Sequence, residues 1–541
     1  MGKLRKTATL LLATTMIATM LSACGAPAPT PAVSDSATAT PEATATASAS
    51  AEATSAAASS EAAPDPSALD ISKAEEMNFI LVGPEAKDAV SVVAELNKLS
   101  QKDLNLTVNY TFLGWENLGN KYNLILSSGE KADMIYTATW NNFQTLARKG
   151  AYLPIEELLP KYAPLSWEGM SKDAWKTATL NGHIYTVPCD WKELMSNGFA
   201  YRMDIAEKVG ITEPITSLEQ LDAYLAACKK AYPDVIPFNA SATELNASLV
   251  NVVMGKYEEV SGRYASAASN DEPKIINFFE TPEFQTACEF GKKAYDSGYW
   301  SKNILSNKNS ADGPFIEGKT FVCKQNITQT SALYTNCIKD HPDWKIGFFG
   351  QMDANGGILH PNVPIGNGVA LPKACSDPAR ALAYVDKLRY DSKYYTLSNY
   401  GIEGKHFDID AATGAPVYKG SADAIGFGYQ SMQPWGWHID KMELPVANQW
   451  PMWKTIYDKY EKTSTFPKYG AFAFDSTAVS AEKAALDNVV DQYYTILIAG
   501  KSKDIPGDIK ILNDKLKAAG LEKFTAEIQK QLDAYWKEMG Y

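Results

Sequence analysis

Hydrophobic and polar residues alternate with two different periods along this chain, beginning near residue 76. The consecutive apolar residues Phe79 to Val82 predict a buried strand, and residues 104–112 alternate apolar with polar and predict a second one. Between them, residues 89–99 place apolar side chains every three to four positions, which predicts an amphipathic helix. A helix at about 116–127 and a strand at 133–137 continue the series. This order is typical of βαβ units and a largely parallel sheet.

The alternation of strands and helices extends through most of the chain, and no fixed-period repeat is present. Further strands are predicted at 183–187, 199–201, 237–239, 320–323, 346–349 and 363–371, and further helices at 142–149, 217–231, 281–297 and from 377 onward. The end of the chain is different, because helices at about 480–499, 508–519 and 523–538 follow one another without strands. We therefore expect an α/β protein with a helical C-terminal region.

Size and charge narrow the class of protein. The chain has 541 residues, with 45% hydrophobic and 21% charged residues, which is ordinary for a soluble globular protein. Its body of about 465 residues exceeds the ~250–300 at which single cores stop growing, so at least two lobes are expected. The net charge of -12 argues against a nucleic-acid partner or an anionic membrane surface, since both require a basic face.

The first 23 residues have the layout of a secretory signal. Lys3, Arg5 and Lys6 precede an apolar run at 10–21, which is short for a membrane span of ~20 residues. The run ends in Leu-Ser-Ala-Cys24, which resembles the bacterial lipobox. The resemblance implies cleavage before Cys24 and attachment of lipid to its sulfur, and the two chains of a diacylglyceryl group anchor a protein stably. We expect the body on the extracellular face of the cytoplasmic membrane.

Residues 24–75 are expected to be a tether. After Cys24 they are almost entirely Ala, Ser, Thr and Pro with a few acidic residues, and they contain no aromatic side chain. Such a segment cannot bury enough apolar surface to fold. As a coil of about fifty residues it would span ~40 Å, which keeps the body close to the membrane.

Cysteine and histidine give little sign of bridges or metal. Six cysteines follow Cys24, but their spacings are wide and no CxxC pair is present, so buried free thiols are favoured over disulfides. A disulfide between Cys323 and Cys337 is the alternative that the sequence leaves open. The five histidines are scattered and suggest no metal site. The six cysteines are Cys189, Cys228, Cys288, Cys323, Cys337 and Cys375.

Residues 313–320, GPFIEGKT, match the phosphate-binding pattern GxxxxGK[ST] in a context that does not fit it. That pattern requires a preceding strand and a helix that starts at the lysine, so that backbone amides cradle phosphate. Here the approach is polar, Pro314 has no amide hydrogen, Glu317 adds negative charge, and a strand follows Thr320. We interpret the segment as a helix or turn that ends at Gly318 before a strand.

Other catalytic patterns are missing from the sequence. It contains neither a GxSxG nucleophile motif nor HExxH. Asp408-Ile-Asp410 starts like a calcium loop, but Thr413 stands where the loop requires glycine, so a hairpin turn at Thr413-Gly414 is expected. Carboxylates are too numerous for a glycosidase pair to be chosen without distances.

Several segments, taken in order, carry a resemblance to a known family. The segments are EPITSLEQLD at 213–222, FIEGKT at 315–320, SDPARAL at 376–382, NYGIEGKHF at 399–407, and the ending from FAFD at 472–475 through LKAAG at 516–520 to QLDAYW at 531–536. Together with the lipobox and tether they resemble the extracellular solute-binding lipoproteins of ABC importers, family 1, carbohydrate type, in a Firmicutes subgroup with a characteristic C-terminal region.

The resemblance implies a type II periplasmic-binding-protein-like fold. Each of two lobes is expected to hold a mostly parallel sheet flanked by helices, with crossings near Val187–Pro188 and Val363–Ala370. The expected bounds are 76–187 plus about 366–430 for lobe I, 188–365 for lobe II, and 431–541 for a helical region that packs on the lobes. Such a protein captures solute in the interlobe cleft and delivers it to the transmembrane subunits of an ABC permease. It is expected to be a monomer, to use no cofactor and not to be an enzyme.

Aromatic residues beside polar residues in loops are the candidate ligand contacts. Sugars have apolar ring faces and polar rims, which suit an aromatic plane next to carboxylate or amide groups. The chain has 12 Trp and 28 Tyr, so we choose candidates by the polar residues next to each aromatic residue in the sequence. The candidates are Trp140, Asn141, Asp190, Trp191, Asn239, Asn326, Asn367, Trp435 and Trp437.

Two alternatives to a sugar receptor remain at this point. One is a receptor of the same build for peptide or another polar solute. The other is a secreted glycoside hydrolase or lyase, which would need an acid–base pair of carboxylates. Neither the sugar, its linkage and length, nor the permease partner follows from the residues.

Overall fold

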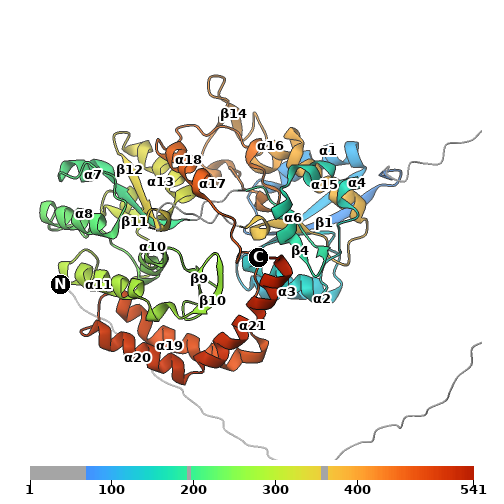
Figure 1. The fold of residues 1–541 in the computed structure, drawn as a ribbon. Helices are drawn as coiled ribbons and strands as arrows, with labels where there is room; N and C mark the ends of the chain where they lie inside the picture. The colour runs from blue at the N-terminus through green and yellow to red at the C-terminus, as the bar shows by residue number, and fades with distance from the viewer. Residues whose placement is uncertain (1–68, 192–195, 355–362) are drawn as a thin grey trace, which may run out of the picture. The chain divides into compact units, whose positions relative to one another are not determined.

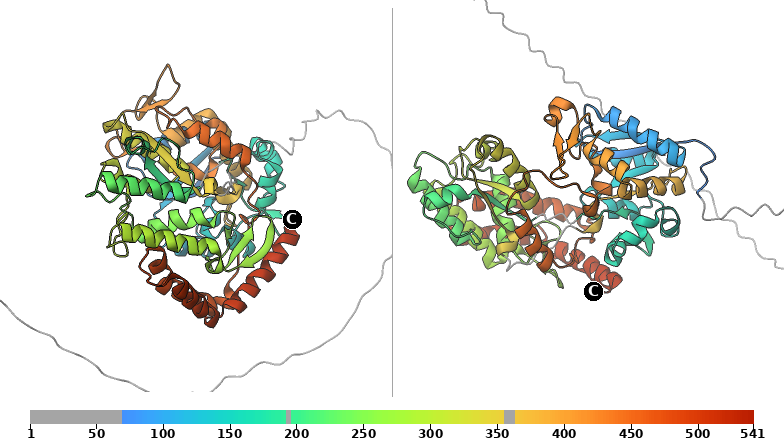
Figure 2. Two further views of the ribbon diagram at one scale, coloured as in Figure 1. Left: turned by 60° about the vertical axis from the view of Figure 1, so that its left-hand side comes forward. Right: turned by 90° about the horizontal axis from the view of Figure 1, so that it is seen from above.

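The computed structural model, drawn in Figure 1, describes residues 69–191, 196–354 and 363–541. Most of its buried hydrophobic side chains belong to two large cores. We call the body around the core that contains Phe79 lobe I, and the body around the core that contains Phe199 lobe II. The predicted signal sequence, Cys24 and nearly all of the predicted tether lie outside the described residues. The right-hand view of Figure 2 shows the blue elements of lobe I and the green elements of lobe II at opposite ends.

Lobe I is built on a five-stranded sheet in the order β2-β1-β3-β13-β6. The register pairs Phe79 of β1 with Tyr110 of β2 and with Met134 of β3, both parallel. Only β13 runs antiparallel to its neighbours, β3 and β6. The prediction of a mostly parallel sheet is therefore confirmed for lobe I. Its strands are β1 (Glu75–Val82), β2 (Leu106–Leu113), β3 (Met134–Thr137), β6 (Val187–Pro188) and β13 (Gly368–Ala370).

Amphipathic helices cover the sheet of lobe I. The apolar stripe predicted at 89–99 is buried at Ala89, Val92 and Leu96, which pack into the core of lobe I. The main helices are α1 (Ala89–Leu104), α2 (Leu118–Ser128), α3 (Phe143–Arg148), α6 (Lys172–Ala178), α15 (Pro378–Tyr390) and α16 (Ser392–Tyr400), with short turns α4 (Leu159–Tyr162) and α5 (Pro164–Gly169) between them.

Lobe II departs from the expected parallel sheet. Its strands are ordered β11-β7-β12, and β7 runs antiparallel to both neighbours. The reason is the path of the chain, since β7 runs outward from the crossing that follows β6, while β11 and β12 run back toward it. The strands are β7 (Asn197–Arg202), β11 (Val322–Asn326) and β12 (Ile346–Gly350).

Helices and a second small sheet complete lobe II. Ser217 caps the predicted helix at 217–231, because its hydroxyl oxygen accepts a hydrogen bond from the Gln220 amide at 3.2 Å. The strand predicted at 237–239 is a turn. The helices include α7 (Met203–Lys208), α8 (Leu218–Ala231), α10 (Asn251–Met254), α11 (Pro282–Ser297), α13 (Ile327–Asp340) and α14 (Gln351–Ala354), and the small sheet joins β8 (Glu258–Glu259), β9 (Ser266–Ser269) and β10 (Glu272–Ile276).

The C-terminal region is helical, as predicted. Its last three helices are divided between the two cores, whereas α18 packs in a smaller cluster around Trp450. Figures 1 and 2 show its red helices alongside the green elements of lobe II, with the last one reaching toward lobe I. Leu497 and Leu512 lie in the core of lobe II, whereas Trp536 lies in that of lobe I. The helices are α18 (Trp453–Thr463), α19 (Ser480–Ile498), α20 (Ile505–Ala518) and α21 (Leu521–Met539).

The two misleading motifs adopt the structures expected of them. The segment 313–320 forms the short helix α12 (Asp312–Ile316), a turn at Gly318 with φ +72°, and then β11. A left-handed turn of this kind ends a helix and presents no row of amides to phosphate. Residues 407–418 form a hairpin of β14 (Phe407–Ile409) and β15 (Pro416–Tyr418), whose turn is held by Asp410.

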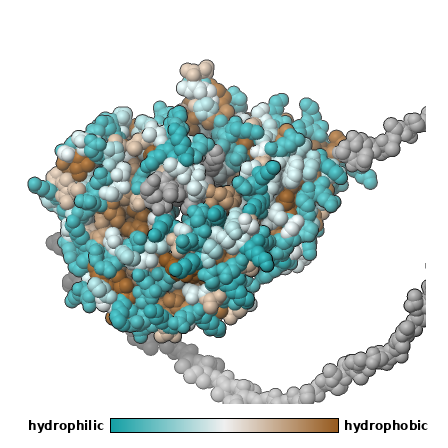
Figure 3. Space-filling model, viewed as in Figure 1, coloured by the Kyte–Doolittle hydropathy of each residue, from teal (hydrophilic) through white to brown (hydrophobic). Residues whose placement is uncertain are grey.

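The surface is mainly hydrophilic on the face drawn in Figure 3, with hydrophobic residues in small patches among hydrophilic ones. The six cysteines after residue 68 are free thiols, and all but Cys375 are buried, as the sequence favoured. Within the described ranges, no helix is long and apolar enough to cross a membrane.

Candidate functional site

Three tryptophans from separate loops of lobe I meet in one cluster. Trp115 follows β2, Trp140 lies in a 3-10 turn (η1, Thr139–Asn141) after β3, and Trp435 lies in a second 3-10 turn (η5, Pro434–Trp437). The Trp115 ring centroid is 6.2 Å from that of Trp140 and 5.9 Å from that of Trp435. We call these three residues the tryptophan cluster.

Two members of the tryptophan cluster are open to solvent. Trp115 is 53% exposed and Trp140 is 52% exposed, whereas Trp435 is half-buried. Large aromatic side chains are usually buried in a soluble protein, and an exposed group of them commonly marks a binding site. The faces of indole rings suit the apolar faces of planar or ring-shaped solutes.

Tyr136 lies beneath the tryptophan cluster and connects it to β13, the first strand of lobe I after the chain returns from lobe II. Its side chain is buried, and its ring centroid is 6.0 Å from Trp140 and 6.1 Å from Trp435. Its hydroxyl donates a hydrogen bond to the side-chain oxygen of Asn367, the residue just before β13. The Tyr122 hydroxyl donates to the Tyr136 carbonyl at 2.6 Å. The floor of the cluster is therefore a hydrogen-bonded part of the core.

Gly436 allows the third tryptophan to reach the cluster. A Cβ atom on Gly436 would lie 2.7 Å from the Gly368 carbonyl oxygen and 3.0 Å from a Val369 methyl group. The 3-10 turn thus packs its backbone directly on β13, which only glycine permits here. This close approach fixes Trp435, and its indole N–H donates to the Gln430 side chain at 3.3 Å.

A second aromatic pair lies at the first crossing. Trp191 stacks on His438 with ring centroids 4.5 Å apart and planes inclined by 28°. The two segments pair through their backbones, since the Asp190 amide donates to the His438 carbonyl at 3.1 Å and the Asp440 amide to the Asp190 carbonyl at 3.1 Å. Trp191 is half-buried. The predicted contacts Asp190 and Trp191 therefore lie next to the segment around His438.

Carboxylates and tyrosines surround His438. His438 is buried, its Nε2 lies 3.0 Å from Asp440 Oδ1, and its Nδ1 lies 3.2 Å from Glu443 Oε1. Glu443 also accepts hydrogen bonds from the hydroxyls of Tyr395, Tyr400 and Tyr429. Burial, followed by the negative charge of Glu443, raises the pKa of each of these three hydroxyls above its usual value. All three hydroxyls consequently stay protonated and donate to Glu443. This network holds His438, the residue on which Trp191 stacks.

The prediction that Trp437 contacts the solute does not fit this structure, because Trp437 lies in the core of lobe I and is fully buried. Its ring centroid is 5.4 Å from Phe79, and its indole N–H donates to the Ser398 hydroxyl at 3.0 Å. In the tight turn Trp-Gly-Trp, the two indoles point to different environments. Trp435 joins the cluster, whereas Trp437 packs the core and has no face open to a solute in this structure.

Two of the four predicted asparagines, Asn326 and Asn367, use their side-chain oxygens in hydrogen bonds within the protein. Asn326 is buried and caps α13 by accepting from the Gln329 amide at 2.8 Å. Asn367 accepts from Tyr136, and Asn141 is buried under the cluster. Asn239 is partly buried, and its backbone amide donates to the Thr320 hydroxyl at 3.2 Å. Asn239 and Asn326 belong to lobe II, so the structure does not bring them together with the tryptophan cluster.

The residues chosen from the sequence did not include Trp115, a member of the tryptophan cluster, or Tyr136, which lies beneath it. Trp115 follows Gly114 at the carboxyl end of β2, and Trp140 follows the carboxyl end of β3. Both strands run parallel to β1, so their carboxyl ends share one edge of the sheet. This shared edge is the signal that could have joined Trp115 to Trp140.

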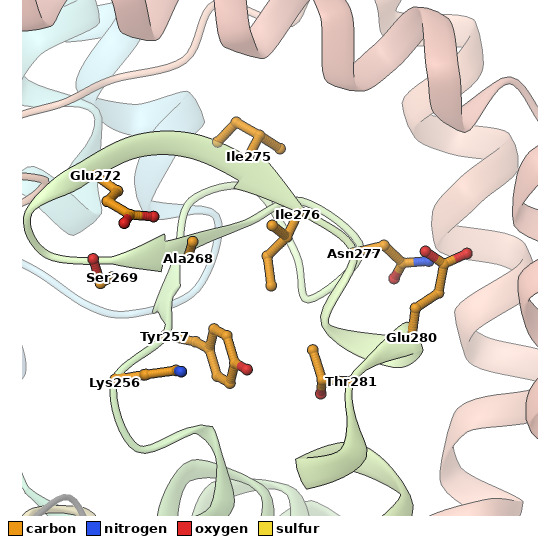
Figure 4. A pocket seen from close by; sticks show the side chains of 10 residues that line it. All are labelled: Lys256, Tyr257, Ala268, Ser269, Glu272, Ile275, Ile276, Asn277, Glu280 and Thr281. Atoms are coloured by element: carbon orange, nitrogen blue, oxygen red, sulfur yellow. The ribbon is translucent and has the colours of Figure 1, made fainter.

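Lobe II holds a cavity of about 610 Å³ that is lined by polar side chains around one tyrosine (Figure 4). Figure 4 shows Lys256 and Tyr257 on one side and Asn277 and Thr281 on the other. The Tyr257 hydroxyl donates to Glu283 at 3.1 Å, and burial, followed by the Glu283 charge, raises the pKa of Tyr257 to about 12. The lining residues are Lys256, Tyr257, Ala268, Ser269, Glu272, Ile275, Ile276, Asn277, Glu280 and Thr281.

Metal ligands are not gathered anywhere in residues 69–191, 196–354 and 363–541. No group of three or more His, Cys, Asp or Glu side chains in those ranges is placed to hold an ion. The chemistry that the described site offers is therefore stacking by indole rings beside hydrogen-bonding polar groups.

Comparison with known proteins identifies the family to which the chain belongs. The model of the bacterial extracellular solute-binding protein family matches residues 86–389, which is more than half of the chain. A domain of unknown function (DUF3502) matches residues 468–537. The first match covers most of both sheets, and the second covers most of the C-terminal helices.

Individual proteins match over most of the chain. A "Carbohydrate ABC transporter substrate-binding protein" of Streptococcus pneumoniae serotype 4 is 25% identical over 484 residues, covering 87% of this chain and 93% of the relative. "Lipoprotein LipO" of Bacillus subtilis strain 168 is 22% identical over 438 residues, covering 78% and 85%. The crystal structure of an N-glycan transport solute binding protein from Streptococcus pneumoniae has a TM-score of 0.69 at 21% identity, covering 85% and 99%.

Proposed function

Because this chain belongs to the bacterial extracellular solute-binding protein family, we propose that it is a receptor for a sugar or oligosaccharide that it delivers to the transmembrane subunits of an ABC permease. The tryptophan cluster is the observation that carries the carbohydrate assignment. Two of its indoles are more than half exposed and lie side by side, as the apolar face of a sugar ring requires. Two similar proteins are named for carbohydrate or N-glycan transport, which supports the same class of solute.

The contacts follow from the geometry of the loops. Trp115, Trp140 and Trp435 stack against sugar rings, and Trp191 with Asp190 supplies a second aromatic–polar contact at the crossing. Lobe II closes over the solute and supplies further hydroxyl, amide and carboxylate partners. Receptor function requires only that the closed form bind the solute better than the open form does. No covalent bond of the solute changes, so the protein acts without a catalytic residue or cofactor.

Thermal-shift and tryptophan-fluorescence titrations with a panel of oligosaccharides test the assignment. A solute at 100 times its Kd adds ~2.7 kcal/mol of stability, which gives a clear rise in Tm. Trp115→Ala and Trp140→Ala should each weaken binding about tenfold or more, while Trp453→Ala, a half-exposed tryptophan on α18, serves as the matched control. A panel in which peptides raise the Tm and sugars do not would contradict the carbohydrate class.

The enzyme alternative is tested in the same samples. Oligosaccharides that raise the Tm are incubated with the protein for a day and then analysed by chromatography. We expect them to be recovered intact. Release of shorter products, absent when the protein is boiled first, would replace the receptor by a hydrolase or lyase.

We further propose that Cys24 carries the lipid and that residues 24–75 tether a monomeric body to the extracellular face of the membrane. The support is the Leu-Ser-Ala-Cys24 sequence, and one similar protein is named a lipoprotein. In a bacterial host, the wild-type protein should partition into detergent with the membrane fraction. Cys24→Ala should prevent this, and a variant that still partitions with the membrane would rule out the anchor.

A further inference from the structure

The last helix has one apolar stripe that is shared by two cores. Along α21 the buried side chains recur every three to four residues, as in any amphipathic helix. The first three of them pack in lobe II and the last four pack in lobe I, and the change occurs between Ile528 and Leu532, within about one turn. The lobe II members are Leu521, Phe524 and Ile528, and the lobe I members are Leu532, Tyr535, Trp536 and Met539.

Two glutamines clamp the middle of α21 to backbone on both sides. The Gln529 side chain accepts from the Ile275 amide at 2.9 Å and donates to the Pro273 carbonyl at 2.5 Å, both in β10. The Gln531 side chain accepts from the Asp475 amide and donates to the Asp475 carbonyl, both at 2.9 Å. Each amide thus satisfies a backbone donor and a backbone acceptor, as a neighbouring strand would. The middle of α21 is therefore hydrogen-bonded to two separate backbone segments.

The lobe I end of α21 is anchored by polar and aromatic contacts. The Tyr535 hydroxyl donates to the Lys468 carbonyl at 2.8 Å, and the Glu538 carboxylate accepts from the Asn181 amide at 3.3 Å. The Trp536 ring centroid is 4.9 Å from that of Tyr469. Asn181 belongs to the hairpin of β4 (Thr179–Leu180) and β5 (His183–Ile184), which lies between α6 and β6 of lobe I.

Other side chains join the cores beside α21. Val260, Ile275 and Phe472 each pack against both the lobe I core and the lobe II core. In addition, Ala267 of the small lobe II sheet lies within the core of lobe I. The two lobes therefore share a continuous apolar seam that runs along α21 and is separate from the crossing strands.

We propose that the C-terminal region, including the domain of unknown function at 468–537, is an interlobe brace that sets how far the lobes move in the absence of solute. Lobes that close around a solute rotate about a few hinge residues. A helix of 19 residues is a stiff rod about 28 Å long, and this one is embedded at both ends. The lobes can then move only by bending the helix between Ile528 and Leu532 or by releasing its lobe I half.

The brace also restricts the direction of motion. The crossing strands form one line of attachment between the lobes and α21 forms another, so rotation about an axis that passes through both attachments is easier than simple opening. Side chains in the seam therefore control the open–closed equilibrium although they lie outside the tryptophan cluster. This role goes beyond solute recognition and does not depend on which solute is bound.

Spin-label distances between the lobes test the brace directly. Labels are attached at Ala94→Cys on α1 and Lys230→Cys on α8, both at exposed positions, and the distance distribution is measured without solute. Trp536→Ala removes the largest lobe I anchor and should broaden the distribution and shift its mean. Leu96→Ala, a buried lobe I core change on α1 away from α21, should lower the Tm and leave the distribution as in wild type.

Milder variants keep the test decisive if Trp536→Ala folds poorly. Met539→Ala trims the end of the stripe, and Gln529→Ala removes the β10 clamp. Both should broaden the distribution. Each also lowers the Tm, Met539→Ala to a similar extent as Leu96→Ala, so Leu96→Ala shows whether lost stability alone broadens the distribution. Distributions identical to wild type in folded Met539→Ala and Gln529→Ala would overturn the brace. Because no solute is present, that result would leave the proposed carbohydrate function untouched.

Discussion

The Tyr136 hydroxyl donates a hydrogen bond to the side-chain oxygen of Asn367, and this bond joins the floor of the tryptophan cluster to β13, the first strand of the lobe I sheet after the chain returns from lobe II. Tyr136 contacts two of the three clustered indoles, and Asn367 directly precedes β13. A change in the position of β13 would therefore move the indole rings. In turn, a solute bound to the rings would influence the position of β13.

Tyr136→Phe tests this connection. The variant keeps the ring and leaves the buried Asn367 oxygen without its donor, which should cost about 1–3 kcal/mol of unfolding free energy and weaken solute binding. Chemical denaturation and titration measure the two effects. Tyr152→Phe is the matched control, since Tyr152 is equally buried and its hydroxyl makes no hydrogen bond within the described structure. Equal losses in the two variants would contradict a special role for Tyr136.

The two tryptophans of η5 should respond in opposite ways to substitution. Trp437→Ala opens a cavity in the lobe I core and should lower the free energy of unfolding by about 3–5 kcal/mol. Trp435→Ala should cost far less stability and more affinity, because Trp435 is half-buried and lies in the cluster. Denaturation and solute titration of both variants check this. A Trp435→Ala protein with wild-type affinity would remove Trp435 from the proposed site.

Gly436→Ala probes the close approach of η5 to β13. The added methyl group meets the Gly368 carbonyl at 2.7 Å, so the turn must shift, at a cost of about 1–3 kcal/mol, and Trp435 shifts with it. We expect a lower Tm together with weaker solute binding. Gly313→Ala is the control, because no atom lies within 4 Å of its added Cβ. If Gly436→Ala keeps wild-type affinity, the position of Trp435 is not critical.

Asp88 should make stability depend on pH in the acid range. Burial on its own would raise the pKa of this carboxyl, but hydrogen bonds from Lys405, Ser91 and His406 outweigh burial and lower the pKa to about 2. A depressed pKa contributes stability that is fully present above the unfolded value near 4 and is lost as the pH falls toward 2. The contribution is about 1–2 kcal/mol.

Denaturation of wild type and Asp88→Asn between pH 2 and pH 7 measures this contribution. The difference between the two proteins should be constant above about pH 5 and shrink as the pH falls below 4. Asp423→Asn changes an exposed ion pair with Lys87 and should stay within about 0.5 kcal/mol of wild type. A wild-type–Asp88→Asn difference that does not change with pH would show that Asp88 acts through packing or neutral hydrogen bonds.

Periodicity was enough to predict most elements of the fold. The strand predicted at Phe79–Val82, the helix predicted at 89–99 and the three C-terminal helices have long or strongly periodic patterns. The structure confirms all of them, with ends that differ by a few residues. Prediction failed where the pattern is short. Residues 237–239 are too few to distinguish a strand from a turn, and the direction of β7 depends on the crossing rather than on its own residues.

The candidate site was only partly accessible to sequence reasoning. Trp140 and Trp435 were identified from their polar neighbours, and the structure places them with Trp115. Trp437 has the same sequence neighbours but is buried in the core, because two residues of rotation in a 3-10 turn point its side chain in a different direction from that of Trp435. The asparagines were chosen for their hydrogen-bonding groups, but a helix cap or a buried tyrosine already uses those of Asn326 and Asn367.

The shared stripe of α21 has a consequence for how the protein unfolds. Since one helix supplies side chains to both cores, neither lobe can lose its tertiary structure without exposing part of the other's interior. The two lobes should consequently melt together, as one cooperative unit in calorimetry, although each alone is large enough to form a domain. Neither lobe corresponds to a continuous stretch of chain that could be excised, and the last turns of α21 complete the core of the lobe whose strands are made first.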